Sequence, residues 1–116
     1  MEITYNQKEF NKWNNLRDLL RTAKSDKDYH SIIEICTKIL ELSHSNKWIG
    51  ILDGLFYKEL GNAYLKIGEN QNAITNFLKA KDFFILYRKN NKLSKPDDWL
   101  KDIELLEKKI EKIQNT

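Results

Sequence analysis

The stretch that decides the fold is residues 54–87, GLFYKELGNAYLKIGENQNAITNFLKAKDFFILY. Its apolar residues recur every three or four positions on both sides of Gly68, which is the spacing of helices with one buried face. Glycine accepts the left-handed conformation that is common just past a helix end. Gly68 therefore predicts the end of one helix, and Asn70 predicts the cap of the next.

The same spacing extends through the rest of the chain and predicts about five helices. The third is expected to run from Trp48 to Ile67, and the fifth to begin at a capping box formed by Ser94 and Asp97, with Pro96 in its first turn. Short connections predict antiparallel hairpins in an all-α fold. The faces expected to be buried include Phe10, Trp13, Leu16, Leu19, Leu20 and Ala23; Tyr29, Ile32, Ile33, Cys36, Ile39 and Leu40; Ala73, Ile74, Phe77, Leu78, Ala80, Phe84 and Ile85; Trp99, Ile103, Leu106, Ile110 and Ile113.

An internal repeat with an offset of 41 residues links two of these hairpins. It superposes Leu16 on Tyr57, Ile32 on Ala73, Cys36 on Phe77 and Ile39 on Ala80. A fixed offset of this kind indicates two copies of one helical unit. Small residues at Gly61, Ala73 and Ala80 let two antiparallel helices approach closely, while Tyr64 and Phe77 fill the space between them.

The second copy resembles a tetratricopeptide repeat (TPR), because Leu60, Gly61, Tyr64, Ala73, Phe77 and Ala80 stand at that family's spacing. The resemblance implies a short right-handed α-solenoid of stacked helical hairpins. We expect a single domain over 1–116, with a degenerate first repeat at 13–46, a second repeat with extended helices at 47–89, and a capping helix at 95–114. The extra residues 47–53 are interpreted as a two-turn helical extension, as in the long-helix variety of the family found in kinesin light chains and bacterial receptors for signalling peptides.

The composition is that of one soluble globular domain. The chain has 116 residues, of which 41% are apolar and 32% charged, and its formal net charge is +3. No stretch is apolar enough for a membrane span, and residues 1–8 lack the apolar run of a secretion signal, so we expect a cytoplasmic protein. Cys36, the single cysteine, agrees with a reducing compartment.

The chain offers few residues for catalysis. Cys36 is expected to be buried, and His30 and His44 are too far apart along one helix to share a metal ion. Neither a phosphate-binding glycine loop nor a histidine–glutamate zinc motif is present in the sequence. We therefore predict a protein that is not an enzyme and that has neither cofactor nor metal.

The resemblance implies that the first helix of each repeat lines a concave groove for a protein or peptide. Carried onto this sequence, the groove positions are Asn14, Arg17, Asp18, Arg21, Lys24 and Ser25 in the first copy and Leu55, Lys58, Glu59, Asn62, Leu65 and Lys66 in the second. From these positions we take the binding residues to be Arg17, Arg21, Lys24, Leu55, Lys58, Asn62, Leu65 and Lys66. Their charge favours an acidic peptide or partner protein bound by a scaffold or adaptor module.

Three alternatives stay open at this stage. The groove of a regulatory or sensor protein would bind a short signalling peptide. A nucleic-acid-binding repeat would use Arg17, Arg21, Lys24, Lys27 and Lys66. The stripe of the fifth helix has coiled-coil spacing and would form a homodimer, but it spans just over two heptads, which favours packing on the fourth helix. A receptor for chaperone C-termini is disfavoured, because Lys58 and Asn62 lack the rest of that clamp.

Overall fold

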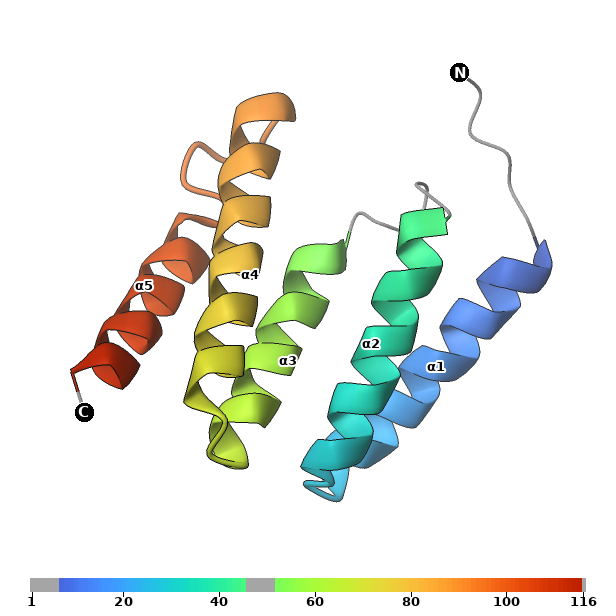
Figure 1. Ribbon diagram of the computed structural model, residues 1–116. Helices are drawn as coiled ribbons and strands as arrows, with labels where there is room; N and C mark the ends of the chain where they lie inside the picture. Colours follow the sequence, from blue (N-terminus) through green and yellow to red (C-terminus); the bar gives the residue numbers. More distant parts are fainter. Residues whose placement is uncertain (1–6, 46–51, 116) are drawn as a thin grey trace.

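Five α-helices make up the described part of the chain: α1 (Gln7–Ser25), α2 (Tyr29–Ser45), α3 (Asp53–Lys66), α4 (Asn70–Asn90) and α5 (Leu100–Gln114) (Figure 1). The structure is a computed structural model and describes residues 7–45 and 52–115. Within these two ranges it contains helices and turns and no strand. The prediction of an all-α fold is confirmed.

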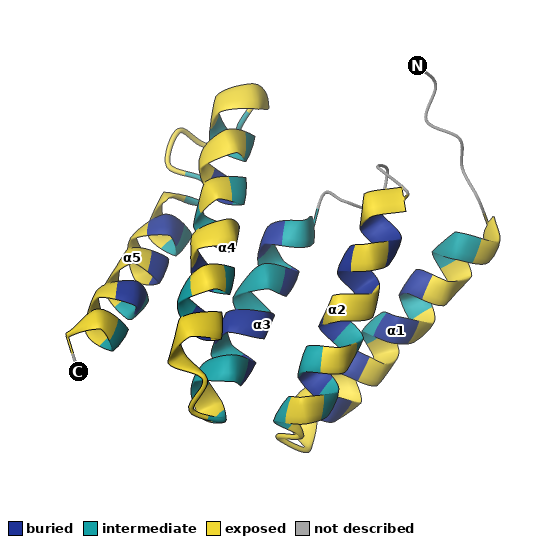
Figure 2. Cartoon of the chain, in the orientation of Figure 1, coloured by how far each residue is buried: buried dark blue, intermediate teal, exposed yellow. Residues whose placement is uncertain are grey.

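The helices follow one another in a single row, and neighbours run in opposite directions (Figure 1). Two hydrophobic clusters hold the row together. The first joins α1, α2 and α3, and the second joins α3, α4 and α5. Because α3 contributes to both clusters, it is the central helix. Buried residues lie on the sides of the helices that pack against other helices (Figure 2).

The turns after α1 and α3 have the same hydrogen bonds, displaced by 41 residues. In the second turn, the Gly68 N–H donates to the Leu65 carbonyl oxygen at 3.1 Å and the Glu69 N–H donates to Tyr64 at 2.9 Å. This is the Schellman arrangement, with Gly68 at a φ of +83°. In the first turn, Lys27 takes the place of the glycine at a φ of +54°. The repeat found in the sequence is therefore also a repeat of backbone geometry.

Replacing Lys27 with glycine tests this equivalence. We expect Lys27→Gly to raise the free energy of unfolding by up to about 1 kcal/mol, because a side chain at positive φ costs more than the added chain entropy of glycine. Urea titration followed by circular dichroism measures the change. Gly68→Ala is the matched control and is expected to lower stability by about 1 kcal/mol, since no atom lies within 4 Å of the added Cβ and only the backbone is strained. A destabilising Lys27→Gly would contradict the interpretation.

α3 and α4 approach each other closely where the Phe77 ring lies over Gly61. A Cβ atom placed on Gly61 would lie 2.5 Å from both Cδ1 and Cε1 of Phe77. Phe77 is completely buried, and so are Ala73 and Ala80 on the same face of α4. Gly61 therefore acts as the sequence predicted, by leaving room for the Phe77 ring.

The substitution Gly61→Ala measures how tightly this contact is packed. In an exposed helix, replacing glycine with alanine raises the free energy of unfolding by about 1 kcal/mol. Here we expect the free energy of unfolding to fall by about 1–3 kcal/mol, because the new methyl group overlaps the Phe77 ring. Thermal unfolding of Gly61→Ala, Phe77→Leu and the double variant measures the coupling free energy between positions 61 and 77. The double variant should be less destabilised than the sum of the singles, and additive losses would contradict the contact.

Two predicted helix starts are wrong. α3 begins at Asp53 with Leu52 as its N-cap, so of the two residues of the expected extension that the structure describes, Asp53 lies in the helix and Leu52 caps it. The residues 46–51, which hold the rest of that extension, lie outside the described ranges. Asn70 is the first residue of α4 and Glu69 is its N-cap. The reason is the Schellman turn, whose second hydrogen bond places Glu69 just before the helix.

The predicted capping box of Ser94 and Asp97, with Pro96 in the first helical turn, is also wrong, because α5 begins only at Leu100. Instead, the Lys95 N–H donates to the Asp98 carboxylate at 3.0 Å, which closes a separate turn. Trp99 then takes a φ of +68° as the N-cap of α5. Its ring stacks on Phe84 with centroids 4.9 Å apart, so a tertiary contact moves the start of the helix.

Several apolar residues expected in the core are exposed. Leu19 is 56% exposed although Leu60, its equivalent in the repeat, is 5% exposed. Leu60 packs in the first cluster, whereas no described helix precedes α1 to cover Leu19. Exposure also corrects the prediction for Leu78 and Ile85, which are 41% and 43% exposed. By contrast, Ile103, Leu106 and Ile110 are buried in the cluster shared with α4, so the α5 stripe packs within the chain.

Candidate functional site

The eight predicted binding residues lie on α1 and α3, and one ion pair joins their two helices. Lys24 Nζ is 2.9 Å from Glu59 Oε1, which brings the predicted side of α1 next to that of α3. Arg21, Lys24 and Lys66 are exposed. The other five are partly buried: Arg17, Leu55, Lys58, Asn62 and Leu65. The two helices thus present one continuous surface.

The two arginines of α1 differ in how firmly they are held. The Arg17 guanidinium carbon is 4.6 Å from the ring centroid of the buried Trp13, a cation–π distance that orients the side chain. Arg21 lies 3.3 Å from Asp18, but both side chains are largely exposed, at 78% and 69%. A pair of this kind contributes little, because water screens it and both side chains lose entropy. Arg21 can therefore exchange Asp18 for another carboxylate at small cost.

A third helix adds a residue that the sequence analysis missed. Lys109 of α5 donates from Nζ to Asn62 Oδ1 at 2.7 Å, and the same Nζ lies 5.5 Å from the Phe77 ring centroid. Partial burial lowers the pKa of Lys109, and repulsion from Lys58 lowers it further. The surface formed by Arg17, Arg21, Lys24, Lys58, Asn62, Lys66 and Lys109 is called the basic face below.

A signal for Lys109 was present in the sequence. When the residues of α5 are placed at 100° intervals, Lys101, Lys108 and Lys112 lie opposite the buried stripe, Lys109 and Asp102 lie on one side of it, and Glu104, Glu107 and Glu111 lie on the other. Glu107 reaches Lys81 of α4 at 3.9 Å, whereas Lys109 reaches α3. Lys109 therefore lies on the side of α5 that meets α3, where it extends the face formed by α1 and α3.

A cavity of about 280 Å³ opens between α1 and α3. Apolar side chains of Leu20, Leu52, Leu55 and Phe56 line it, and charged groups surround them. The charged residues are Arg17, Arg21, Lys24 and Glu59. The cavity thus combines four predicted residues, Arg17, Arg21, Lys24 and Leu55, whereas Lys58, Asn62, Leu65 and Lys66 do not line it.

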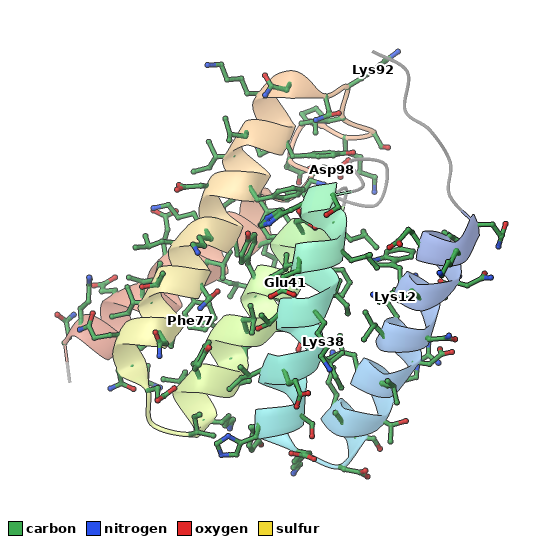
Figure 3. All side chains as sticks on the ribbon, turned by 45° about the vertical axis from the view of Figure 1, so that its right-hand side comes forward. Lys12, Lys38, Glu41, Phe77, Lys92 and Asp98 are labelled. Atoms are coloured by element: carbon green, nitrogen blue, oxygen red, sulfur yellow. The ribbon has the colours of Figure 1, made fainter. Side chains whose placement is uncertain are left out.

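Two further cavities lie away from the basic face. One of about 820 Å³ separates α1 from α2, with Lys12, Lys38 and Glu41 at its edge (Figure 3). Its lining residues Leu16 and Leu42 correspond in the repeat to the larger Tyr57 and Phe83, which explains why the first hairpin is the more open. The other, of about 430 Å³, lies by the α4–α5 connection, where Figure 3 shows Lys92 and Asp98. The sequence analysis predicted neither.

The residues weighed as candidates for catalysis are dispersed. Cys36 is fully buried, and burial raises the pKa of its thiol to about 12. His44 Nε2 is 3.5 Å from the Tyr57 hydroxyl, next to Asp53, whose carboxyl pKa is raised by burial. His30 is exposed at the other end of α2. In the ranges 7–45 and 52–115, no group of three His, Cys, Asp or Glu residues is placed to hold a metal ion.

The burial of Cys36 makes its reactivity a test of the core. At pH 8 we expect Ellman's reagent to label the folded protein very slowly, since the thiol is covered and a pKa of about 12 leaves almost no thiolate. In urea the same thiol should react within minutes, with one equivalent released per chain. Rapid labelling of the native protein would contradict the burial of Cys36 in the cluster formed by α1, α2 and α3.

Comparison of the chain with models of protein families, with curated proteins and with solved structures found no match. None of the helices that the structure describes is both long and apolar enough to cross a membrane.

Proposed function

We propose that this chain is a non-catalytic interaction module that binds an acidic peptide or an acidic segment of a partner protein on its basic face. The observation that carries the proposal is the continuity of positive charge across α1, α3 and α5. Six cationic side chains contribute to it: Arg17, Arg21, Lys24, Lys58, Lys66 and Lys109. The ion pair of Lys24 with Glu59 and the hydrogen bond of Lys109 to Asn62 join the three helices into one surface.

A TPR-like architecture supports this proposal. The hairpins repeat with the same turn geometry, and Gly61, Ala73 and Ala80 contact or flank one aromatic ring. In such an array the first helix of each hairpin lines the concave side, where partners bind. We propose that α5 occupies the place of the next first helix, because it packs on α4 and contacts α3 through Lys109. The basic face is then the concave side of a short solenoid.

The electrostatics of the face favour a carboxylate ligand. Glu59 pairs with Lys24, and Asp18 pairs with Arg21. Burial lowers the pKa of Lys109, and repulsion from Lys58 and Lys66 lowers it further, while attraction to Glu59 offsets part of this effect. An incoming carboxylate would relieve this repulsion and form charge-assisted hydrogen bonds. The amide of Asn62 adds a group able to bond a peptide backbone.

Charge reversal tests the proposal. We expect Arg17→Glu, Arg21→Glu and Lys58→Glu together to weaken partner binding at least about tenfold while helicity and melting temperature stay nearly unchanged, since these side chains are not in the core. The partner is first captured from a host lysate on immobilised wild-type protein and identified by mass spectrometry. Its affinity for the purified variants is then measured by calorimetry at two salt concentrations.

The matched control carries the same change in net charge at exposed lysines outside the basic face. Lys89→Glu, Lys92→Glu and Lys95→Glu together also take the formal net charge from +3 to −3. We expect this control to retain at least half of the wild-type affinity. Equal losses in both triple variants would show a nonspecific charge effect and contradict the basic face as the binding site. Retention of RNA in place of protein, with a steep salt dependence, would favour the nucleic-acid alternative.

A further inference from the structure

We infer that the cavity between α1 and α3 holds one large apolar side chain of the bound segment, and that the acidic residues next to that side chain contact Arg17 and Arg21. This inference rests on the proposed function and specifies its ligand. The occupant is an internal segment of a partner protein in which an aromatic or long aliphatic residue is flanked by Glu or Asp. The end of a chain, with its terminal carboxylate, is not required.

The lining of the cavity points to an apolar occupant. Leu20, Leu52, Leu55 and Phe56 form its inner wall, and the volume is about 280 Å³. An apolar cavity of about 150 Å³ is enough to hold benzene. The space is therefore adequate for a phenylalanine or leucine side chain, and such a side chain would remove the apolar wall from water.

The neighbouring position on the basic face is closed, which singles out this cavity. By the repeat offset, Arg17 and Arg21 of α1 correspond to Lys58 and Asn62 of α3. Between α3 and α5, the Lys109 side chain lies over the Phe77 ring and donates to Asn62. Among the residues that the structure describes, Arg21 pairs with Asp18 on its own helix, and the apolar wall of the cavity between α1 and α3 stays open beside it.

The charged rim selects a ligand whose carboxylates flank its apolar residue. Lys24 neutralises Glu59 at 2.9 Å, so that carboxylate does not repel an acidic ligand. Arg17 is oriented by the Trp13 ring, and Arg21 forms a weak exposed pair with Asp18. Guanidinium groups bind carboxylates through two parallel hydrogen bonds, which fixes orientation as well as adding affinity.

Two synthetic peptides test the inference directly. One is Gly-Ser-Glu-Phe-Glu-Glu-Gly-Ser-Gly, labelled at its N-terminus and amidated at its C-terminus, and the other has Ala in place of Phe. Fluorescence anisotropy at low salt measures their binding to the full chain. We expect the Phe peptide to bind about tenfold more tightly, which corresponds to about 1.4 kcal/mol.

Variants of the cavity wall distinguish binding in the cavity from binding to the rest of the basic face. Leu55→Trp fills the cavity and is expected to remove the preference for Phe, so that the Phe and Ala peptides bind with similar affinity. Leu19→Trp is the control, since Leu19 is an exposed residue of α1 that does not line the cavity, and it should retain the preference. Leu55→Ala, which removes the wall without adding bulk, should reduce the preference and serves if the tryptophan variant does not fold.

Each outcome decides between the two proposals. Equal binding of both peptides, lost on reversing Arg17 and Arg21, would overturn the cavity site and leave the basic face standing. A preference for Phe that persists in Leu55→Trp would overturn the cavity site as well. Peptide binding that charge reversal does not weaken would overturn the basic face too. Failure of the wild-type chain to bind either peptide would overturn the ligand inferred here, while binding of the captured partner continues to test the proposed function.

Discussion

The contact between the Phe77 ring and the backbone of Gly61 is the constraint on which the rest of the structure depends. A side chain at position 61 would overlap the ring at 2.5 Å, so α3 and α4 are as close as their sequences allow. α3 is then flanked by α4 through this contact and by α2 through the cluster around Leu60 and Ala63. The remaining side of α3 carries Lys58, which lies one turn before Gly61, and Asn62, which directly follows it. The core contact therefore determines which residues of α3 reach the surface.

The same ring connects the core to the basic face. Lys109 Nζ lies 5.5 Å from the Phe77 centroid and bonds Asn62, so α5 is held against α3 by a cation above a buried aromatic residue. This arrangement partly buries Lys109 next to other cations, which lowers its pKa. The cations of three packed helices thus lie on one surface, and this is the basis of the binding of anions proposed above.

Much of the fold could be predicted from the sequence, because it depends on local signals. The period of the apolar residues and the glycine at position 68 identify the helices of the second hairpin and the end of α3. The start of α5 could not be predicted, because the stacking of Trp99 on Phe84 and the turn closed by Asp98 are tertiary. Leu19 has the pattern of a core residue, yet it lies at the end of the helical row, where no described helix covers it.

The candidate site, like the fold, could be predicted only where local sequence signals determine it. Residues of α1 and α3 could be assigned from the repeat, whereas Lys109 required knowledge of how α5 turns toward α3. The most direct test of the account is the NMR signal of the Gly61 α-protons. The account predicts strong cross-relaxation between these protons and the Phe77 ring, and an upfield ring-current shift that disappears in Phe77→Leu. Gly61 α-protons at random-coil positions, with no transfer to an aromatic ring, would contradict it.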